Sequence, residues 1–226
     1  MSKMNLLDFF DWAQMAYSNT PTIEDYNIIM NYNNSETGVQ FFVGENQGRV
    51  FISFRGSDER TDWNNNLKFW RKTLPYGNQK TKIRIHTGFY NLYQTIREEI
   101  QKIGNYCSSK EDIKSINIVG HSLGGALAVL SAIDLQYNFP QLCYNIVVFG
   151  CPRVGNNAFA TSYNNRLIKT IRVENGNDLV SKLPLKIMGY KHVGAKVHIG
   201  FPRFLLFWSI KSHYRVKYYE KLWRKK

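Results

Sequence analysis

The segment 120–124 reads Gly-His-Ser-Leu-Gly and fits the pattern G-x-S-x-G. An apolar run over 116–119 predicts a strand before it, and an Ala- and Leu-rich run over 125–135 predicts a helix after it. A serine at such a corner projects its hydroxyl clear of the sheet, and small residues two positions away let the backbone close up. The free N–H groups at the start of the helix favour a negative charge beside the serine. Ser122 is therefore a candidate nucleophile, and the backbone N–H of Leu123 is a candidate donor to an oxyanion.

The candidate serine needs two partners, because its hydroxyl is a weak nucleophile unless a histidine takes its proton and an acid orients that histidine. In enzymes with this kind of turn, the acid follows the serine in the chain and the histidine follows the acid. The acids after Ser122 are Asp134, Glu174, Asp178 and Glu220. Asp134 lies well along the predicted helix, and Glu220 follows every histidine. Asp178 is preferred over Glu174, because its polar loop beyond the predicted strand 167–173 lets it reach inward.

The histidine is less well determined by position. The five histidines are His86, His121, His192, His198 and His213. His86 precedes the serine, and His121 is its neighbour and cannot turn back onto it. Three candidates remain after Asp178, and their spacing alone does not separate them.

The rest of the chain predicts the elements that would hold these side chains. We expect a helix over 4–17, strands over 39–43 and 50–54 with a turn at 45–48, a short strand over 82–86 and a helix over 88–103. Strands over 116–119, 144–149 and 167–173 are apolar along their length and alternate with helices, which is typical of a parallel sheet covered on both faces. The predicted fold class is α/β, with a mostly parallel central sheet and helices on both faces, in a single domain over 1–226.

Composition narrows the class of protein. The chain has 226 residues, 43% of them hydrophobic, which is enough for a substantial core. No run of about 18 apolar residues that could span a bilayer occurs in the sequence, and the residues 1–17 lack the pattern of a secretory signal. The three cysteines and five histidines are scattered, so neither a metal site nor a cofactor is expected. We expect reduced thiols and an intracellular, cytoplasmic location.

The net charge of +13 is concentrated near the C-terminus, because the segment 182–226 holds twelve Lys or Arg and one acid. Such a segment attracts nucleic acid or an anionic membrane surface. No nucleic-acid-binding motif accompanies these residues, and the aromatic residues among them, such as Trp208, suit a lipid interface. We expect peripheral contact with an anionic membrane surface and no nucleic acid, with a solvated basic tail as the alternative.

Five motifs in the same order resemble the lipase class 3 family, the fungal triacylglycerol lipase type of α/β-hydrolase. They are VFISFRGS at 50–57, HTGF at 86–89, VGHSLGGALA at 119–128, FGCPRVGN at 149–156 and GYKHVG at 189–194. The resemblance extends from about residue 50 to residue 215. It implies an α/β-hydrolase fold.

The resemblance also implies roles for the candidate residues. Ser122 would be the nucleophile and Asp178 the acid, because Asp178 falls in a family loop motif over 175–184. His213 would be the base, with Tyr218 a few residues on. His192 would then be structural, and His198 stays open as an alternative base.

Further roles follow from the family only. Ser57 would be the second oxyanion donor, through its backbone N–H and hydroxyl, beside Leu123. The residues 58–70 occupy the place of the family's lid, and Trp63 resembles the tryptophan of that lid. Trp63 and His121 are the expected lid or substrate-binding residues.

The function implied by the resemblance is hydrolysis of acyl esters of lipids through an acyl-enzyme, of the triacylglycerol lipase or phospholipase A1 type. The substrate would be a lipid or another acyl ester. The alternative is a non-catalytic lipid- or membrane-binding protein that retains the hydrolase fold.

Overall fold

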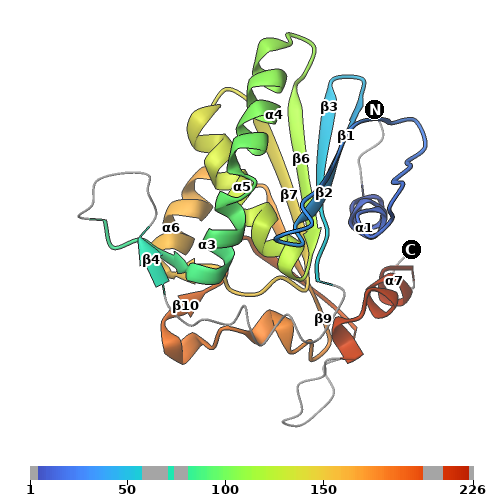
Figure 1. Ribbon diagram of the computed structural model, residues 1–226. Coiled ribbons are helices and arrows are strands. Elements are labelled where there is room, and N and C mark those ends of the chain that lie inside the picture. The colour runs from blue at the N-terminus through green and yellow to red at the C-terminus, as the bar shows by residue number, and fades with distance from the viewer. Residues whose placement is uncertain (1–4, 58–70, 74–80, 201–210, 224–226) are drawn as a thin grey trace.

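A sheet of seven strands forms the centre of the computed structural model, which describes residues 5–57, 71–73, 81–200 and 211–223 (Figure 1). In spatial order the strands are β1 (Asn27–Asn33), β2 (Gln40–Asn46), β3 (Arg49–Phe54), β6 (Ser115–His121), β7 (Cys143–Phe149), β9 (Thr170–Asn175) and β11 (Ala195–Ile199). The pairs from β3 to β11 are parallel, whereas β1, β2 and β3 are joined antiparallel. The predicted mostly parallel sheet is confirmed.

Helices cover both faces of this sheet, as predicted (Figure 1). One face carries α3 (Thr87–Gln94), α4 (Arg97–Ser109), α5 (Leu123–Asn138) and α6 (Asn157–Arg166), and the other carries α1 (Leu6–Met15) and α7 (Arg215–Trp223). Side chains of β3 pack alternately against the helices on the two faces of the sheet, because successive side chains of a strand point to opposite faces. Val50 and Ile52 pack in the core under α5, whereas Phe51 packs in the second core with Trp12 of α1.

A smaller antiparallel sheet lies beside the first, in the order β10 (Tyr190–Lys191), β8 (Gly155–Asn156), β5 (Arg84–His86) and β4 (Arg71–Thr73). Three short 3-10 helices complete the described elements: η1 (Val180–Lys182), η2 (Lys186–Met188) and η3 (Lys211–His213). Among the described helices, none has the length and apolar character that crossing a membrane requires.

Several elements differ from the sequence prediction. The helix expected over 88–103 is two helices, α3 and α4, with Thr95 and Ile96 between them. The strand expected over 167–173 begins only at Thr170, because Leu167 ends α6. Sequence analysis missed β1, β11, α6 and α7. Polar or charged residues are interspersed with the apolar ones in all four, and tertiary pairing stabilises them more than local propensity does.

Candidate active site

Ser122 occupies the sharp turn between β6 and α5. Its backbone has φ 61° and ψ −127°, a conformation that costs a non-glycine residue on the order of 1–3 kcal/mol. The flanking glycines are required by space, because a Cβ on Gly120 would lie 2.3 Å from the carbonyl oxygen of Gly124. A Cβ on Gly124 would lie 2.3 Å from the carbonyl oxygen of Phe54. The close approach that the G-x-S-x-G spacing predicts is therefore present.

An acid and a histidine form a buried pair near this turn. His213 Nδ1 lies 2.9 Å from Asp178 Oδ2, and the Asp178 side chain is fully buried. The Tyr218 hydroxyl donates to the same oxygen at 2.6 Å, and the backbone N–H of Val180 donates to Oδ1 at 2.9 Å. Burial, together with the Asp178 charge, holds the pKa of Tyr218 well above its ordinary value, so its hydroxyl keeps the donated proton. The carboxylate is thus fixed by three donors on different elements.

The pair and the serine converge at the carboxyl ends of β6, β7 and β9. The backbone N–H of Ser122 donates to the carbonyl of Phe149 at 2.9 Å. Gly150, the residue after Phe149, has φ 57°, and a Cβ on it would lie 2.9 Å from both Asp178 Oδ2 and His213 Nδ1. Ser122 Oγ is buried and has no hydrogen-bond partner among the described residues, so the bond from this hydroxyl to His213 is not formed in this structure.

His121 connects the turn to His213 and to the N-terminal region. The rings of His121 and His213 stack with centroids 4.6 Å apart. His121 Nε2 lies 3.0 Å from the carbonyl oxygen of His213, and His121 Nδ1 lies 3.1 Å from the hydroxyl of Tyr17. That hydroxyl also accepts from the backbone N–H of Gly56 at 3.1 Å. Both ring nitrogens of this expected substrate-binding residue are therefore engaged within the protein.

The candidate oxyanion donors belong to the start of α5 and to the loop after β3. Leu123 begins α5, where N–H groups have no acceptor within the helix. Ser57 follows β3, and its neighbour Gly56 abuts the turn, because a Cβ on Gly56 would lie 3.1 Å from Ser122 Cβ. Trp63 and the expected lid over 58–70 lie outside the described residues.

The alternative acid and base candidates have other partners. The Glu174 carboxylate is buried among Arg172, Lys182 at 2.8 Å and Lys196 at 3.1 Å. His192 Nε2 lies 2.7 Å from the carbonyl oxygen of Ser181, and burial strongly lowers the pKa of His192. His198 lies on β11, opposite Glu174 of β9. Of the two acids, Asp178 is the one that His213 contacts.

Sequence reasoning missed Tyr17, Gly150 and the bond from Tyr218 to Asp178. The motif FGCPRVGN contains Gly150 and was a usable signal, but nothing in the spacing of Tyr17 indicated a contact 104 residues further along the chain. No group of three or more His, Cys, Asp or Glu side chains suited to a metal ion occurs within the described part of the chain.

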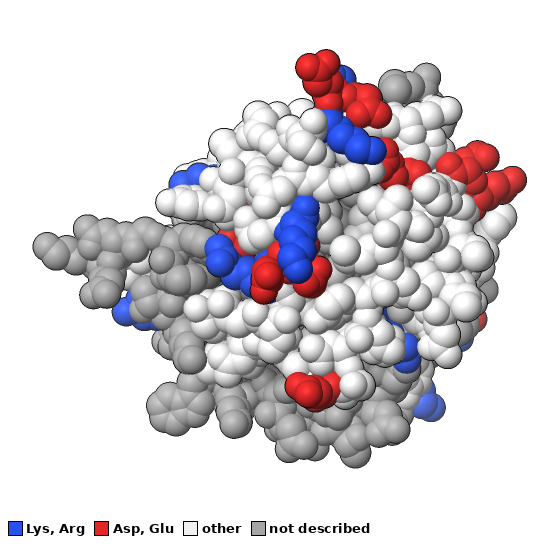
Figure 2. Space-filling view, turned by 45° about the horizontal axis from the view of Figure 1, so that its top comes forward, with Lys and Arg blue, Asp and Glu red and all other residues white. Residues whose placement is uncertain are grey.

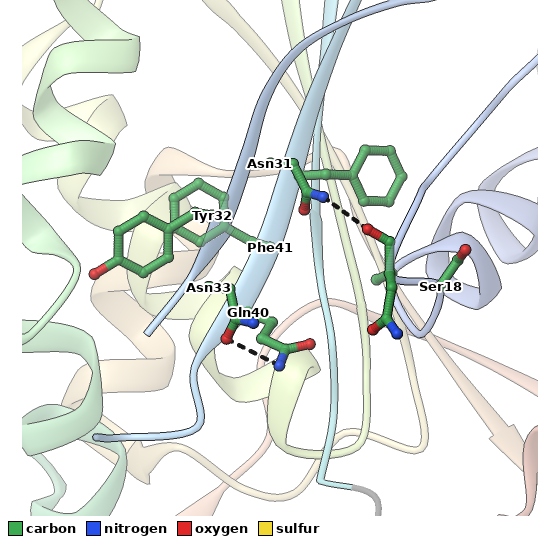
Figure 3. A pocket seen from close by; sticks show the side chains of 9 residues that line it. Ser18, Asn31, Tyr32, Asn33, Gln40 and Phe41 are labelled. Atoms are coloured by element: carbon green, nitrogen blue, oxygen red, sulfur yellow. Dashed lines mark hydrogen bonds between the residues drawn. The ribbon is translucent and has the colours of Figure 1, made fainter. Parts of the chain in front are cut away.

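A separate pocket lies between the end of α1 and strands β1 and β2 (Figure 3). Its polar lining consists mainly of neutral side chains that bond to their neighbours. Asn31 donates to the carbonyl of Asn19 at 3.0 Å, and Gln40 donates to Asn33 at 3.0 Å. Neither Ser122 nor the pair of Asp178 and His213 lines it.

A serine in a strained turn between a parallel strand and a helix, above a sheet covered by helices, defines an α/β-hydrolase fold. A solved structure of Rhizomucor miehei triacylglyceride lipase matches with a TM-score of 0.76 and 25% sequence identity, over 84% of this chain and 77% of that chain. Residues 51–188 match the family model described as Lipase (class 3). The chain belongs to the class 3 lipase family, as its motifs predicted.

Two curated relatives illustrate the range of the family. Over 161 residues the chain is 30% identical to secreted mono- and diacylglycerol lipase 1 of Fusarium solani, a match that covers 70% of this chain and 46% of that protein. Over 151 residues it is 32% identical to phospholipase A(1) DAD1, chloroplastic, of Arabidopsis thaliana, which covers 60% of this chain and 33% of that protein. The chain thus spans less than half the length of these two relatives.

The names of the relatives contradict the expected intracellular, cytoplasmic location. The lipases of Fusarium solani and Malassezia restricta are named as secreted, and the Arabidopsis thaliana enzyme as chloroplastic. The expectation was wrong because a compartment is specified by address segments that are separate from the catalytic fold. Cysteine content and charge therefore do not determine it.

Proposed function

We propose that this chain hydrolyses acyl esters of lipids through an acyl-enzyme on Ser122. The observation that carries the proposal is the bond from His213 to buried Asp178 beside the strained turn of Ser122. A histidine oriented in this way has Nδ1–H facing the carboxylate, which leaves Nε2 basic. The hydrogen bond from Ser122 Oγ to His213 is not formed in this structure, which is compatible with this role because such bonds often tighten only when substrate is bound.

In the proposed reaction, Ser122 Oγ attacks the ester carbonyl carbon while its proton passes to Nε2 of His213. The negative carbonyl oxygen is stabilised by the backbone N–H groups of Leu123 and Ser57. Collapse breaks the bond to the alcohol oxygen, which takes the proton from His213. Water then attacks the acyl-enzyme with His213 as base, which releases the acid and restores Ser122. Asp178 keeps the ring oriented and remains ionised throughout.

The substrate class rests on the relatives, whose names include acylglycerol lipases and phospholipases A1. Both kinds of enzyme cleave acyl esters of glycerol lipids, so the shared chemistry is the ester and not the head group. Hydrolysis of triacylglycerol and of a diacyl phospholipid should therefore be measured side by side.

A fluorophosphonate probe tests the nucleophile and the base together. We expect labelling at Ser122, located by mass spectrometry, to be abolished in Ser122→Ala and reduced about 10³-fold or more in His213→Ala. Ser131→Ala is a matched control, because Ser131, on α5, is likewise buried and its hydroxyl likewise has no partner among the described residues. His192→Ala and His198→Ala should keep labelling; loss in His198→Ala instead of His213→Ala would identify His198 as the base.

The competing hypothesis is a non-catalytic protein that retains this fold. Absence of labelling in the wild-type protein, with and without lipid vesicles, would reject the hydrolase proposal and favour this alternative. The intact set of Ser122, Asp178 and His213 argues against it.

We also propose that α7 and the residue before it contact an anionic lipid surface. Tyr214, Tyr219 and Trp223 are 44%, 37% and 50% exposed, while Tyr218 and Leu222 bury the opposite side of the helix. Exposed aromatic rings beside Lys217 suit the interface of a bilayer. On the face in Figure 2, by contrast, some Lys and Arg lie beside Asp and Glu and the others stand apart from one another, so the described residues form no extended basic surface there.

Vesicle sedimentation of Ser122→Ala protein tests this contact without hydrolysis. We expect binding to phosphatidylglycerol vesicles to exceed binding to phosphatidylcholine vesicles, and to fall about fivefold or more in Lys217→Glu. The matched control is Lys102→Glu, because Lys102 is an exposed lysine of α4 that is likewise paired with a glutamate. Equal binding to both lipids would reject the proposal, and salt-sensitive retention of DNA would point to nucleic acid.

A further inference from the structure

One chain of hydrogen bonds joins the loop of Ser57, the second candidate oxyanion donor, to the backbone of the proposed base. It runs from the backbone N–H of Gly56 through the Tyr17 hydroxyl to the ring of His121 and then to the carbonyl of His213. We propose that Tyr17 and His121 are positioning residues that hold the Gly56-Ser57 backbone and the His213 backbone in fixed places around Ser122. This inference rests on the proposed function.

The direction of every bond in this chain is determined. The carbonyl oxygen of His213 can only accept, so His121 Nε2 carries a hydrogen and donates it over 3.0 Å. Burial, and next the neighbouring His213, hold the pKa of His121 well below its ordinary value, so the ring is neutral and Nδ1 is an acceptor. Tyr17 must then donate to Nδ1, which leaves its oxygen to accept from Gly56.

Tyr17 is suited to this double role. Burial raises the pKa of Tyr17 to about 12, against the opposing effect of Arg215, so its hydroxyl keeps the proton that it donates. The guanidinium carbon of Arg215, at the start of α7, lies 3.5 Å from the centre of the Tyr17 ring, and that of Arg55 lies at 5.5 Å. The Tyr17 ring therefore contacts Arg55, which follows β3, and Arg215, which follows His213.

A neutral His121 also suits the chemistry of its neighbour. Its ring stacks on that of His213, which must take up a proton during the proposed reaction. A charged His121 would repel the resulting cation and would lose the lone pair that accepts from Tyr17. The hydrogen-bond chain ends on two main-chain groups, the Gly56 N–H and the His213 carbonyl. A break at either ring nitrogen of His121 therefore disconnects one of these backbone segments from the other. A displacement of about 1 Å at such groups can cost about 100-fold in rate.

The test compares Tyr17→Phe, His121→Gln and His121→Leu with wild-type protein in kcat, KM and the rate of fluorophosphonate labelling. Tyr17→Phe and His121→Leu should each lower kcat about 10- to 100-fold with KM nearly unchanged. Their combination should be little worse than either alone, because the chain is already broken. His121→Gln, whose side-chain amide can still donate toward the His213 carbonyl, should retain more activity than His121→Leu.

A matched control separates positioning from stability. Tyr144 is also a buried tyrosine whose hydroxyl donates to two backbone carbonyls, those of Leu135 and Phe139. Tyr144→Phe should lower the melting temperature and leave kcat unchanged. Full kcat in Tyr17→Phe would overturn the inference, as would a loss that merely follows the amount of folded protein.

A failure of the proposed function can be told apart from a failure of the positioning inference. If wild-type protein does not label at Ser122, the hydrolase proposal fails, and the ¹⁵N chemical shifts of the His213 ring decide the positioning role. A change of these shifts in Tyr17→Phe, absent in Tyr144→Phe, would support positioning. Unchanged shifts would reject it.

Discussion

At the scale of single residues, the site depends on positions where only a small residue fits. Gly150 has a positive φ and lies directly against the contact between Asp178 and His213. It reaches this place because Phe149, the last residue of β7, accepts the backbone N–H of Ser122. Any added atom would therefore push into the acid and the base together.

We expect Gly150→Ala to lower kcat about 10- to 100-fold, because its methyl group would lie 2.9 Å from Asp178 Oδ2 and from His213 Nδ1. The matched control is Gly38→Ala, because Gly38 has φ 69° and nothing within 4 Å of an added Cβ. Both variants should lose roughly 1–2 kcal/mol of unfolding free energy from the backbone conformation. Steady-state kinetics and urea unfolding measure the two effects; equal kcat in both variants would contradict the argument.

At the scale of elements, one buried carboxylate holds three helices together. Asp134 of α5 accepts from the Tyr93 hydroxyl of α3 at 2.5 Å and from Arg97 Nε of α4 at 2.9 Å. Asn138, one turn further along α5, donates to the other oxygen at 2.9 Å. This cluster fixes the helices behind the Ser122 turn and does not touch the turn itself.

Asp134→Ala should therefore destabilise the protein by about 2–4 kcal/mol, because it leaves a buried tyrosine hydroxyl and a partly buried guanidinium without their acceptor. Urea unfolding measures this change, and kcat of the remaining folded protein should be unaffected. Lys102→Ala removes an exposed ion pair from α4 and should leave the free energy of unfolding almost unchanged. Similar losses in both variants would show that the buried cluster is not what holds these helices.

At the scale of the whole molecule, burial keeps several histidines neutral in the folded state. Burial lowers the pKa of His86 to about 4 and, more strongly, the pKa values of His121 and His192. In the unfolded chain each would bind a proton below pH about 6.5. The unfolded state therefore binds more protons than the folded state under acidic conditions, and stability falls as the pH decreases.

We expect the free energy of unfolding to be fully retained above pH 7 and to fall between pH 6.5 and pH 4. Each neutral histidine contributes about 1.4 kcal/mol per pH unit well below 6.5. His86→Asn should remove one such contribution, because asparagine does not titrate in this range. The cap of α3 should be kept, because an asparagine can still accept from the N–H groups that His86 caps. Urea unfolding from pH 7 to pH 4 checks this, and an unchanged slope in the variant would contradict it.

The sequence by itself determined the features that depend on short spacing. The G-x-S-x-G motif located the turn of Ser122, because the clash of residues 120 and 124 is local. The alternation of apolar strands and helices predicted the parallel sheet, because burial on both faces leaves a continuous apolar run. The motifs between residues 50 and 194 also predicted the family correctly.

Only the tertiary structure decided which distant side chains meet. Spacing did not separate His192, His198 and His213, and the contact of His213 with Asp178 arises because α7, which follows His213, packs against both β9 and α1. The same packing brings Tyr17 to His121 and Tyr218 to Asp178. Such contacts join residues that are far apart in the chain, so no local periodicity predicts them. Each contact depends on how all the helices and strands between the two residues pack together.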